Sequence, residues 1–161
     1  MAWEARIARA FRLDDAGWAR HANPWSGWTR MAVLPLLALA VWSRAWIGWW
    51  AALPLDLLVV FLWLNPRLFP PPRHLDAWIS RGVLGEQRWL DRDRVPVPAH
   101  HRRLPHLLAA VAAAGAIGVV YGVAMLEPWP TLLGLVVAYL GKLWFIDRMV
   151  WLHQDMGRER R

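Results

Sequence analysis

The sequence predicts an all-α integral membrane protein: a bundle of four transmembrane helices with an N-terminal amphipathic helix and a partly helical cytoplasmic loop. Hydrophobic residues make up 57% of the 161 residues and are gathered in two long stretches, 31–64 and 107–141. The first stretch holds two charged residues and the second holds one. A soluble helix shows a polar face, and residues 107–126 show none. We therefore treat residues 1–161 as a single membrane domain.

The first apolar stretch divides into two membrane-spanning helices. A helix of about 20 residues crosses a bilayer, so residues 31–64 are too many for one span. The break falls at Arg44, which lies between Trp42 and Trp46. Tryptophan favours the headgroup level of a bilayer. We expect transmembrane helices over 26–43 and 46–65.

The second apolar stretch divides at residues 127–129, and Pro130 suits the first turn of the helix that follows. We expect transmembrane helices over 105–126 and 130–152. Small residues on these two helices predict that they pack against each other, in preference to a homodimer contact. The small residues are Ala110, Ala114, Gly118 and Gly122 on one helix, with Ala109, Ala113 and Gly115 widening the same face, and Gly134, Ala138 and Gly141 on the other.

The positions of the arginines predict the orientation of the chain. They gather before residue 31, in the loop 66–104 and after residue 147, whereas the two short turns between spans hold one arginine. By the positive-inside rule, both termini and the loop 66–104 lie in the cytoplasm, and the membrane is the inner membrane of a bacterial cell. The formal charge of +7 then reflects topology, and we expect no nucleic-acid partner.

Two further helices are predicted outside the spans. Residues 1–20 form an amphipathic helix in the plane of the membrane interface, or alternatively a solvated helix that caps the bundle. The loop holds a second helical segment over about 74–91, which follows the prolines at 70–72.

Asp56 and Lys142 lie within the predicted spans. Asp56 lies roughly 15 Å from the outer end of its helix at 1.5 Å per residue, and Lys142 lies roughly 18–20 Å from the outer end of its own. A lone charge at that depth costs at least about 2.5–3.5 kcal/mol. We expect the two to pair or Asp56 to be protonated. The alternative is that Lys142 reaches toward Asp147 and leaves Asp56 alone.

Polar residues near the expected cytoplasmic ends of the helices define a candidate site that faces the cytoplasm. Histidine with carboxylate is a ligand set for zinc or iron, but the spacing of these histidines matches no metal motif. We expect no metal and no other cofactor, and keep a zinc or iron site as the less favoured alternative. The candidate residues are His21, Asn23, Arg30, Arg67, His100, His101, His106, Asp147, Arg148 and His153.

Two Asn-Pro turns mark the cytoplasmic ends of the first two spans, one at Asn23 and one at Asn65. We interpret Ser26 as the cap of the first span. The two turns face the same side and could meet. With Arg30 and Arg67 nearby, this region would also suit an anionic headgroup.

The chain resembles a family of small bacterial multi-pass membrane proteins whose function is unknown. The stretches that carry the resemblance are HANPWSGWTR (21–30), WLNPRLFPPP (63–72), SRGVLGEQRWL (80–90) and KLWFIDRMVWL (142–152). The resemblance covers most of the chain and implies a membrane location without implying an activity.

The sequence favours a non-catalytic membrane protein, either an accessory subunit or a binder of lipid or of a small apolar ligand. Its expected partners are the lipid bilayer and a homo-oligomer or larger membrane complex. The alternative is a small membrane enzyme or carrier that uses the polar site described above, so whether the protein is catalytic stays open.

Overall fold

The computed structural model describes residues 15–158, which are helical wherever they are regular, with no strand among them. The first described helix is α2, Asp15–His21. The predicted interfacial helix over 1–20 lies outside the described residues except at this last part. An all-helical architecture is therefore confirmed for the part of the chain that can be described.

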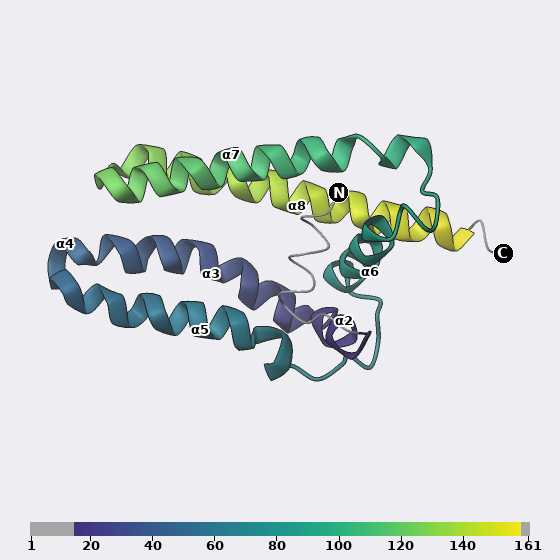
Figure 1. Ribbon diagram of the computed structural model, residues 1–161, viewed down its shortest axis with the longest axis horizontal. Helices are drawn as coiled ribbons and strands as arrows, with labels where there is room; N and C mark the ends of the chain where they lie inside the picture. The colour runs from purple at the N-terminus through teal and green to yellow at the C-terminus, as the bar shows by residue number, and fades with distance from the viewer. Residues whose placement is uncertain (1–14, 159–161) are drawn as a thin grey trace.

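Residues 24–68 form a helical hairpin, hairpin A, whose two long helices lie side by side (Figure 1). Its elements are α3 (Pro24–Trp42), α4 (Arg44–Ile47), the 3-10 turn η1 (Gly48–Ala51) and α5 (Ala52–Leu68). The predicted second span begins at residue 46, but residues 44–51 form the tip of the hairpin instead. Gly48 permits this reversal because its φ of +57° lies in the left-handed region that favours glycine.

Helix α7 (Leu104–Met125) and helix α8 (Pro128–Arg158) form a second hairpin, hairpin B. Small residues bring the two backbones together, as their pattern predicted. A Cβ added to Gly115 would lie 2.2 Å from the backbone nitrogen of Ala138, so the contact between the helices tolerates no side chain there. Helix α8 continues six residues past its predicted end, because its last turns pack on α6 instead of leaving the bundle.

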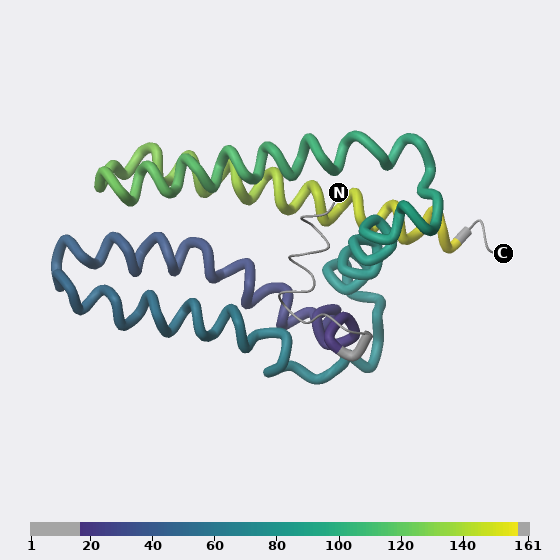
Figure 2. The backbone as a smooth tube through the Cα atoms, in the orientation of Figure 1, coloured from purple at the N-terminus to yellow at the C-terminus, as the bar shows by residue number. Residues whose placement is uncertain are grey.

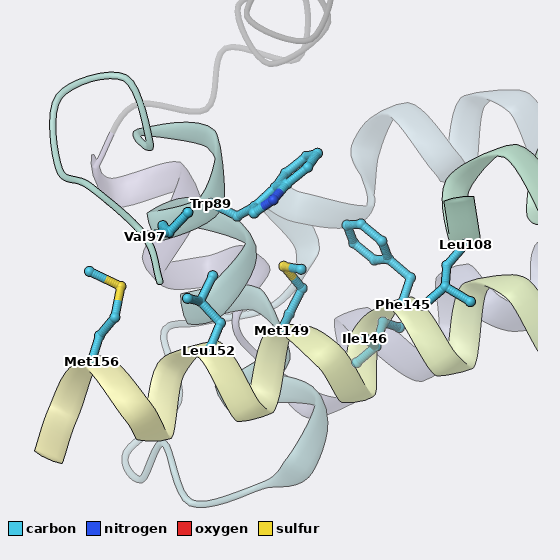
Figure 3. Close-up of a cluster of buried hydrophobic side chains, with 8 residues drawn as sticks. All are labelled: Trp89, Val97, Leu108, Phe145, Ile146, Met149, Leu152 and Met156. Atoms are coloured by element: carbon cyan, nitrogen blue, oxygen red, sulfur yellow. The ribbon is translucent and has the colours of Figure 1, made fainter. Parts of the chain in front are cut away.

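The predicted loop helix is observed as α6, Trp78–Leu90, and it lies across the last turns of α8 (Figures 1 and 2). A Cβ on Gly85 would lie 1.9 Å from the carbonyl oxygen of Met149, which shows how closely α6 approaches α8. An apolar core fills this crossing (Figure 3). Its buried members are Trp89, Val97, Leu108, Phe145, Ile146, Met149, Leu152 and Met156.

Both hairpin tips lie at one end of the bundle, the tip end, and α2 and α6 lie at the other, the basal end (Figure 1). Polar contacts from α4 and α3 join the two hairpins. Near the tip, Arg44 donates from Nη2 to the carbonyls of Val123 and Ala124, at 2.8 and 2.6 Å, where α7 ends. A cation at these carbonyls also interacts favourably with the helix dipole. Farther along, the Tyr139 hydroxyl of α8 donates to the Met31 carbonyl of α3.

Three segments are long and apolar enough to cross a membrane: Pro24–Leu68, Ala99–Met125 and Pro128–Gly157. The first is hairpin A, which folds back on itself. Much of the surface of both hairpins is apolar and exposed, the reverse of a soluble bundle. Exposed side chains include Leu36, Leu39, Leu53, Leu57 and Val60 on hairpin A and Ile117, Val120, Leu133 and Leu140 on hairpin B. Such a surface suits contact with lipid.

Candidate functional site

A cavity of about 370 Å³ lies at the basal end, where α3 of hairpin A faces α8 of hairpin B and α6. We call it the basal cavity. Polar side chains gather on part of its wall, and the remainder is apolar. Its lining residues are His21, Gly27, Arg30, Met31, Leu34, Ile79, Val83, Glu86, Ala138, Tyr139, Lys142 and Ile146. The cavity therefore presents charged groups and apolar surface to the same ligand.

Arg30 is held in the wall of this cavity by neighbours from α2 and α3. Its Nη1 donates to Nδ1 of His21 at 2.6 Å and to the hydroxyl of Ser26 at 3.0 Å. Because a guanidinium group can only donate, Nδ1 of His21 must be the acceptor, and Nε2 then carries the proton of the neutral ring. Arg30 is thus positioned in advance of any ligand.

His21 stays neutral in this setting. Burial lowers the pKa of His21 to about 3, and the positive charges of Arg30 and Lys142 act in the same direction. The formal charge on the cavity wall is then that of Arg30 and Lys142 against Glu86 alone, a net single positive charge. The cavity is accordingly suited to one anionic group.

Lys142 occupies the α8 wall of the basal cavity, with its Nζ 5.0 Å from the centre of the Phe145 ring. The predicted ion pair between Lys142 and Asp56 does not form in the structure. Asp56 is exposed on α5, and α3 lies between α5 and α8 (Figure 1). The prediction compared only the positions of the two residues along their helices, and such positions do not indicate which helices are neighbours.

A second cavity of about 320 Å³ lies along the same contact between α3 and α8, nearer the tip end. We call it the tip cavity. Apart from the hydroxyl of Thr131 and the indole nitrogens its lining is apolar. The lining residues are Pro35, Ala38, Leu39, Trp42, Trp46, Pro128, Thr131, Leu132 and Leu135. Along α3 from Arg30 toward the tip end, the charged basal cavity is therefore followed by the apolar tip cavity.

The two Asn-Pro segments meet at the base of hairpin A, as the sequence suggested. The predicted turn at Asn65 is wrong, however, because Asn65 and Pro66 lie inside α5, which continues to Leu68. Ser26 donates from its hydroxyl to Oδ1 of Asn65 at 2.7 Å, and Nδ2 of Asn65 donates to the Thr29 hydroxyl at 2.8 Å. Ser26 and Asn65 are both fully buried, at 0% exposure. Because Arg30 also donates to Ser26, these bonds connect the fold of hairpin A to the wall of the basal cavity.

Asn23, rather than Ser26, is the N-cap of α3. Its side-chain oxygen accepts a hydrogen bond from the backbone nitrogen of Trp25 at 2.9 Å, and its Nδ2 donates to the carbonyl of Pro70 at the same distance. Pro24 follows at the first helical position, where its missing N–H costs no hydrogen bond. Ser26 lies within the first turn, which frees its hydroxyl for Asn65.

The remaining residues of the predicted polar site do not converge on one place. Arg67 is exposed and lies 4.4 Å above the ring of Trp63. Asp147 accepts a hydrogen bond from the Trp78 indole at 3.2 Å, and His106 packs on Trp89 with 4.9 Å between ring centres. The last two contacts join α8 and α7 to α6, whereas that of Arg67 lies within α5, and none of the three residues lines the basal cavity.

Two residues of the predicted polar site lie on α8 and each has a buried side-chain nitrogen without a hydrogen-bond partner. These atoms are Nε of Arg148 and Nδ1 of His153. Arg148 lies 4.0 Å above the ring of Trp151, and the carbonyl of His153 accepts a bond from Arg88 at 2.9 Å. His100 and His101 instead lie beside Asp155 near the end of α8, and that cluster is considered below.

Glu86 and Tyr139 line the basal cavity and were absent from the predicted site. Glu86 lies on α6, and Tyr139 lies within an apolar stretch of α8. A signal existed for Tyr139: it is one of two tyrosines in the chain, and it is three residues from Lys142, on the same face of a helix.

The helical fold, with long helices whose exposed surfaces are apolar, is typical of membrane proteins. Within that class the chain belongs to a family of unknown function, DUF6653, whose profile matches residues 2–160. This confirms the family resemblance that the sequence suggested. A search of curated proteins and a search of solved structures each found no match.

Proposed function

We propose that the protein is a four-span inner-membrane protein that binds an anionic amphiphile, a phospholipid or fatty acid, between its two hairpins. The observation that carries the proposal is the basal cavity, in which Arg30 and Lys142 face a largely apolar wall. A carboxylate or phosphate group would be bound by Arg30 and Lys142, with Nε2 of His21 as a further donor. A charged donor in a partly dry site favours such a head over a neutral one.

The tip cavity supports the second half of the proposal. It lies on the same contact between α3 and α8, and its apolar lining suits an acyl chain. A ligand whose head lies at Arg30 would extend its tail along α3 toward Trp42. We therefore favour an amphiphile over a soluble anion, for which the apolar surfaces would serve no purpose.

Binding of an anionic lipid is tested by native mass spectrometry of the detergent-purified protein. Phosphatidylglycerol should be retained more strongly than phosphatidylcholine, and Lys142→Gln should weaken its retention by about 10- to 100-fold, the value of one charge-assisted hydrogen bond. Arg67→Gln is the matched control, because it removes one exposed cation outside the cavity. If the two variants lost phosphatidylglycerol retention equally, the effect would come from the net charge of the protein, and the proposal would be contradicted.

The four-span topology, with both termini in the cytoplasm, is tested by cysteine labelling. The chain contains no Cys, so each introduced thiol is the sole target. Glu127→Cys, at the tip end, should react with a membrane-impermeant maleimide in cells with a permeabilised outer membrane. Asp93→Cys, at the basal end, should react only after lysis of the inner membrane. Labelling of Asp93→Cys in unlysed cells would contradict the proposed orientation and support the opposite one.

A further inference from the structure

A cluster of two histidines and one aspartate lies at the basal end, apart from the basal cavity. His100 and His101 belong to the short 3-10 helix η2, Ala99–His101, and Asp155 lies near the end of α8. Oδ2 of Asp155 is 3.3 Å from Nε2 of His100 and 2.9 Å from Nε2 of His101. Two imidazole nitrogens and one carboxylate oxygen thus lie close together, although Asp155 is more than fifty positions from the two histidines in the sequence.

The spacing of these atoms matches that of metal ligands. One ligand atom from each of the three residues lies within 4.8 Å of the other two. In a tetrahedral zinc site with bonds of about 2.0–2.1 Å, neighbouring ligand atoms are about 3.3 Å apart. Small rotations of the two imidazole rings would therefore admit an ion between them and the carboxylate.

The surroundings hold the cluster in place and leave a path to it. The side chain of His101 is 1% exposed, whereas that of His100 is 65% exposed and that of Asp155 is 33% exposed. The turn is closed by a hydrogen bond of 3.0 Å from the backbone nitrogen of His101 to the carbonyl of Pro98. One ligand is thus fixed in the interior, and an ion can enter from the exposed side with water as a fourth ligand.

We propose that His100, His101 and Asp155 bind a divalent transition-metal ion of the zinc class. Imidazole is a ligand of borderline softness, so two imidazoles beside one carboxylate favour zinc over magnesium or calcium. The bound ion would join the segment before α7 to the end of α8. This site is separate from the amphiphile cavity, so neither proposal depends on the other.

Metal binding is tested on protein purified without a histidine tag, by titration with Zn²⁺ followed by calorimetry. We expect one saturable Zn²⁺ per chain. His100→Ala and Asp155→Asn should each weaken binding by at least about 10-fold, the lower end of the loss seen even when only the supporting shell of a metal site is altered. Zn²⁺ should also raise the midpoint of thermal unfolding of the unaltered protein and not that of His100→Ala.

Controls make the result specific to the cluster. His74→Ala removes an exposed histidine elsewhere and should leave Zn²⁺ binding unchanged. Asp155→Asn keeps an oxygen that can accept from His101, so the fold is preserved while the anionic ligand is lost. Absence of saturable Zn²⁺ binding, or equal weakening by His74→Ala and His100→Ala, would overturn the proposal and leave a histidine–aspartate contact that only supports the fold.

Discussion

Replacing Gly115 by alanine is expected to lower the free energy of unfolding by about 3 kcal/mol, the upper end of the usual range for overpacking. The added Cβ would lie 2.2 Å from the backbone nitrogen of Ala138, 2.7 Å from its Cα and 2.8 Å from the carbonyl oxygen of Gly134. All three are backbone atoms, so no side-chain rotation can relieve the clash. The helices α7 and α8 must move apart, and thermal unfolding in detergent, followed by tryptophan fluorescence, measures the loss.

Gly118→Ala is the matched control, one turn along the same helix. Its Cβ would meet its nearest neighbour, the Cα of Gly134, at 3.3 Å, a contact that a shift of a few tenths of an ångström relieves. Alanine also favours the helical state by about 0.5–1 kcal/mol over glycine, so we expect little net change. If Gly115→Ala were as stable as Gly118→Ala, the close approach of α7 to α8 would be contradicted.

The pattern of small residues predicted the pairing of α7 with α8 but not the exact contact. The repeat of one small residue in every four ran through Gly118 and Gly122, with Gly115 beside it. The closest approaches are at Gly122 and Gly115, and Gly118 lies farther from α8. A helix has 3.6 residues per turn, so a strict repeat of four drifts around its surface. The contact between two crossing helices follows the geometry of packing, which the repeat in one sequence does not specify.

The candidate site was predictable where the interacting residues lie close in sequence. His21 and Arg30 are nine positions apart, and they form a direct contact in the cavity wall. Lys142 was recognised as a charge out of place, but its pairing with Asp56, one of the alternatives, does not form. The position of a residue along a helix does not indicate which neighbouring helix its side chain faces. Glu86 reaches the cavity only through the crossing of α6 over α8, a tertiary arrangement without a sequence signal.

The hydrogen bond between Ser26 of α3 and Asn65 of α5 leads to the second large effect. Asn65→Ala is expected to lower the free energy of unfolding by about 2–3 kcal/mol, since it removes one buried and one partly buried hydrogen bond and leaves the Ser26 hydroxyl without its acceptor. Thermal unfolding in detergent measures the change. Asn23→Ala should cost less, about 1–2 kcal/mol, because the two bonds that it removes, the cap of α3 and the bond to the Pro70 carbonyl, are both only partly buried.

A double-mutant cycle identifies the contact responsible. Ser26→Ala alone should cost about 1–2 kcal/mol, and the double variant of Ser26 and Asn65 should be less destabilised than the sum of the two single variants. Additive losses would contradict a direct bond between the two side chains. Because Arg30 donates to the same hydroxyl, Ser26→Ala should also weaken phosphatidylglycerol retention, whereas Asn23→Ala should not. The bonds that close hairpin A would then also position the cation that the proposed ligand needs.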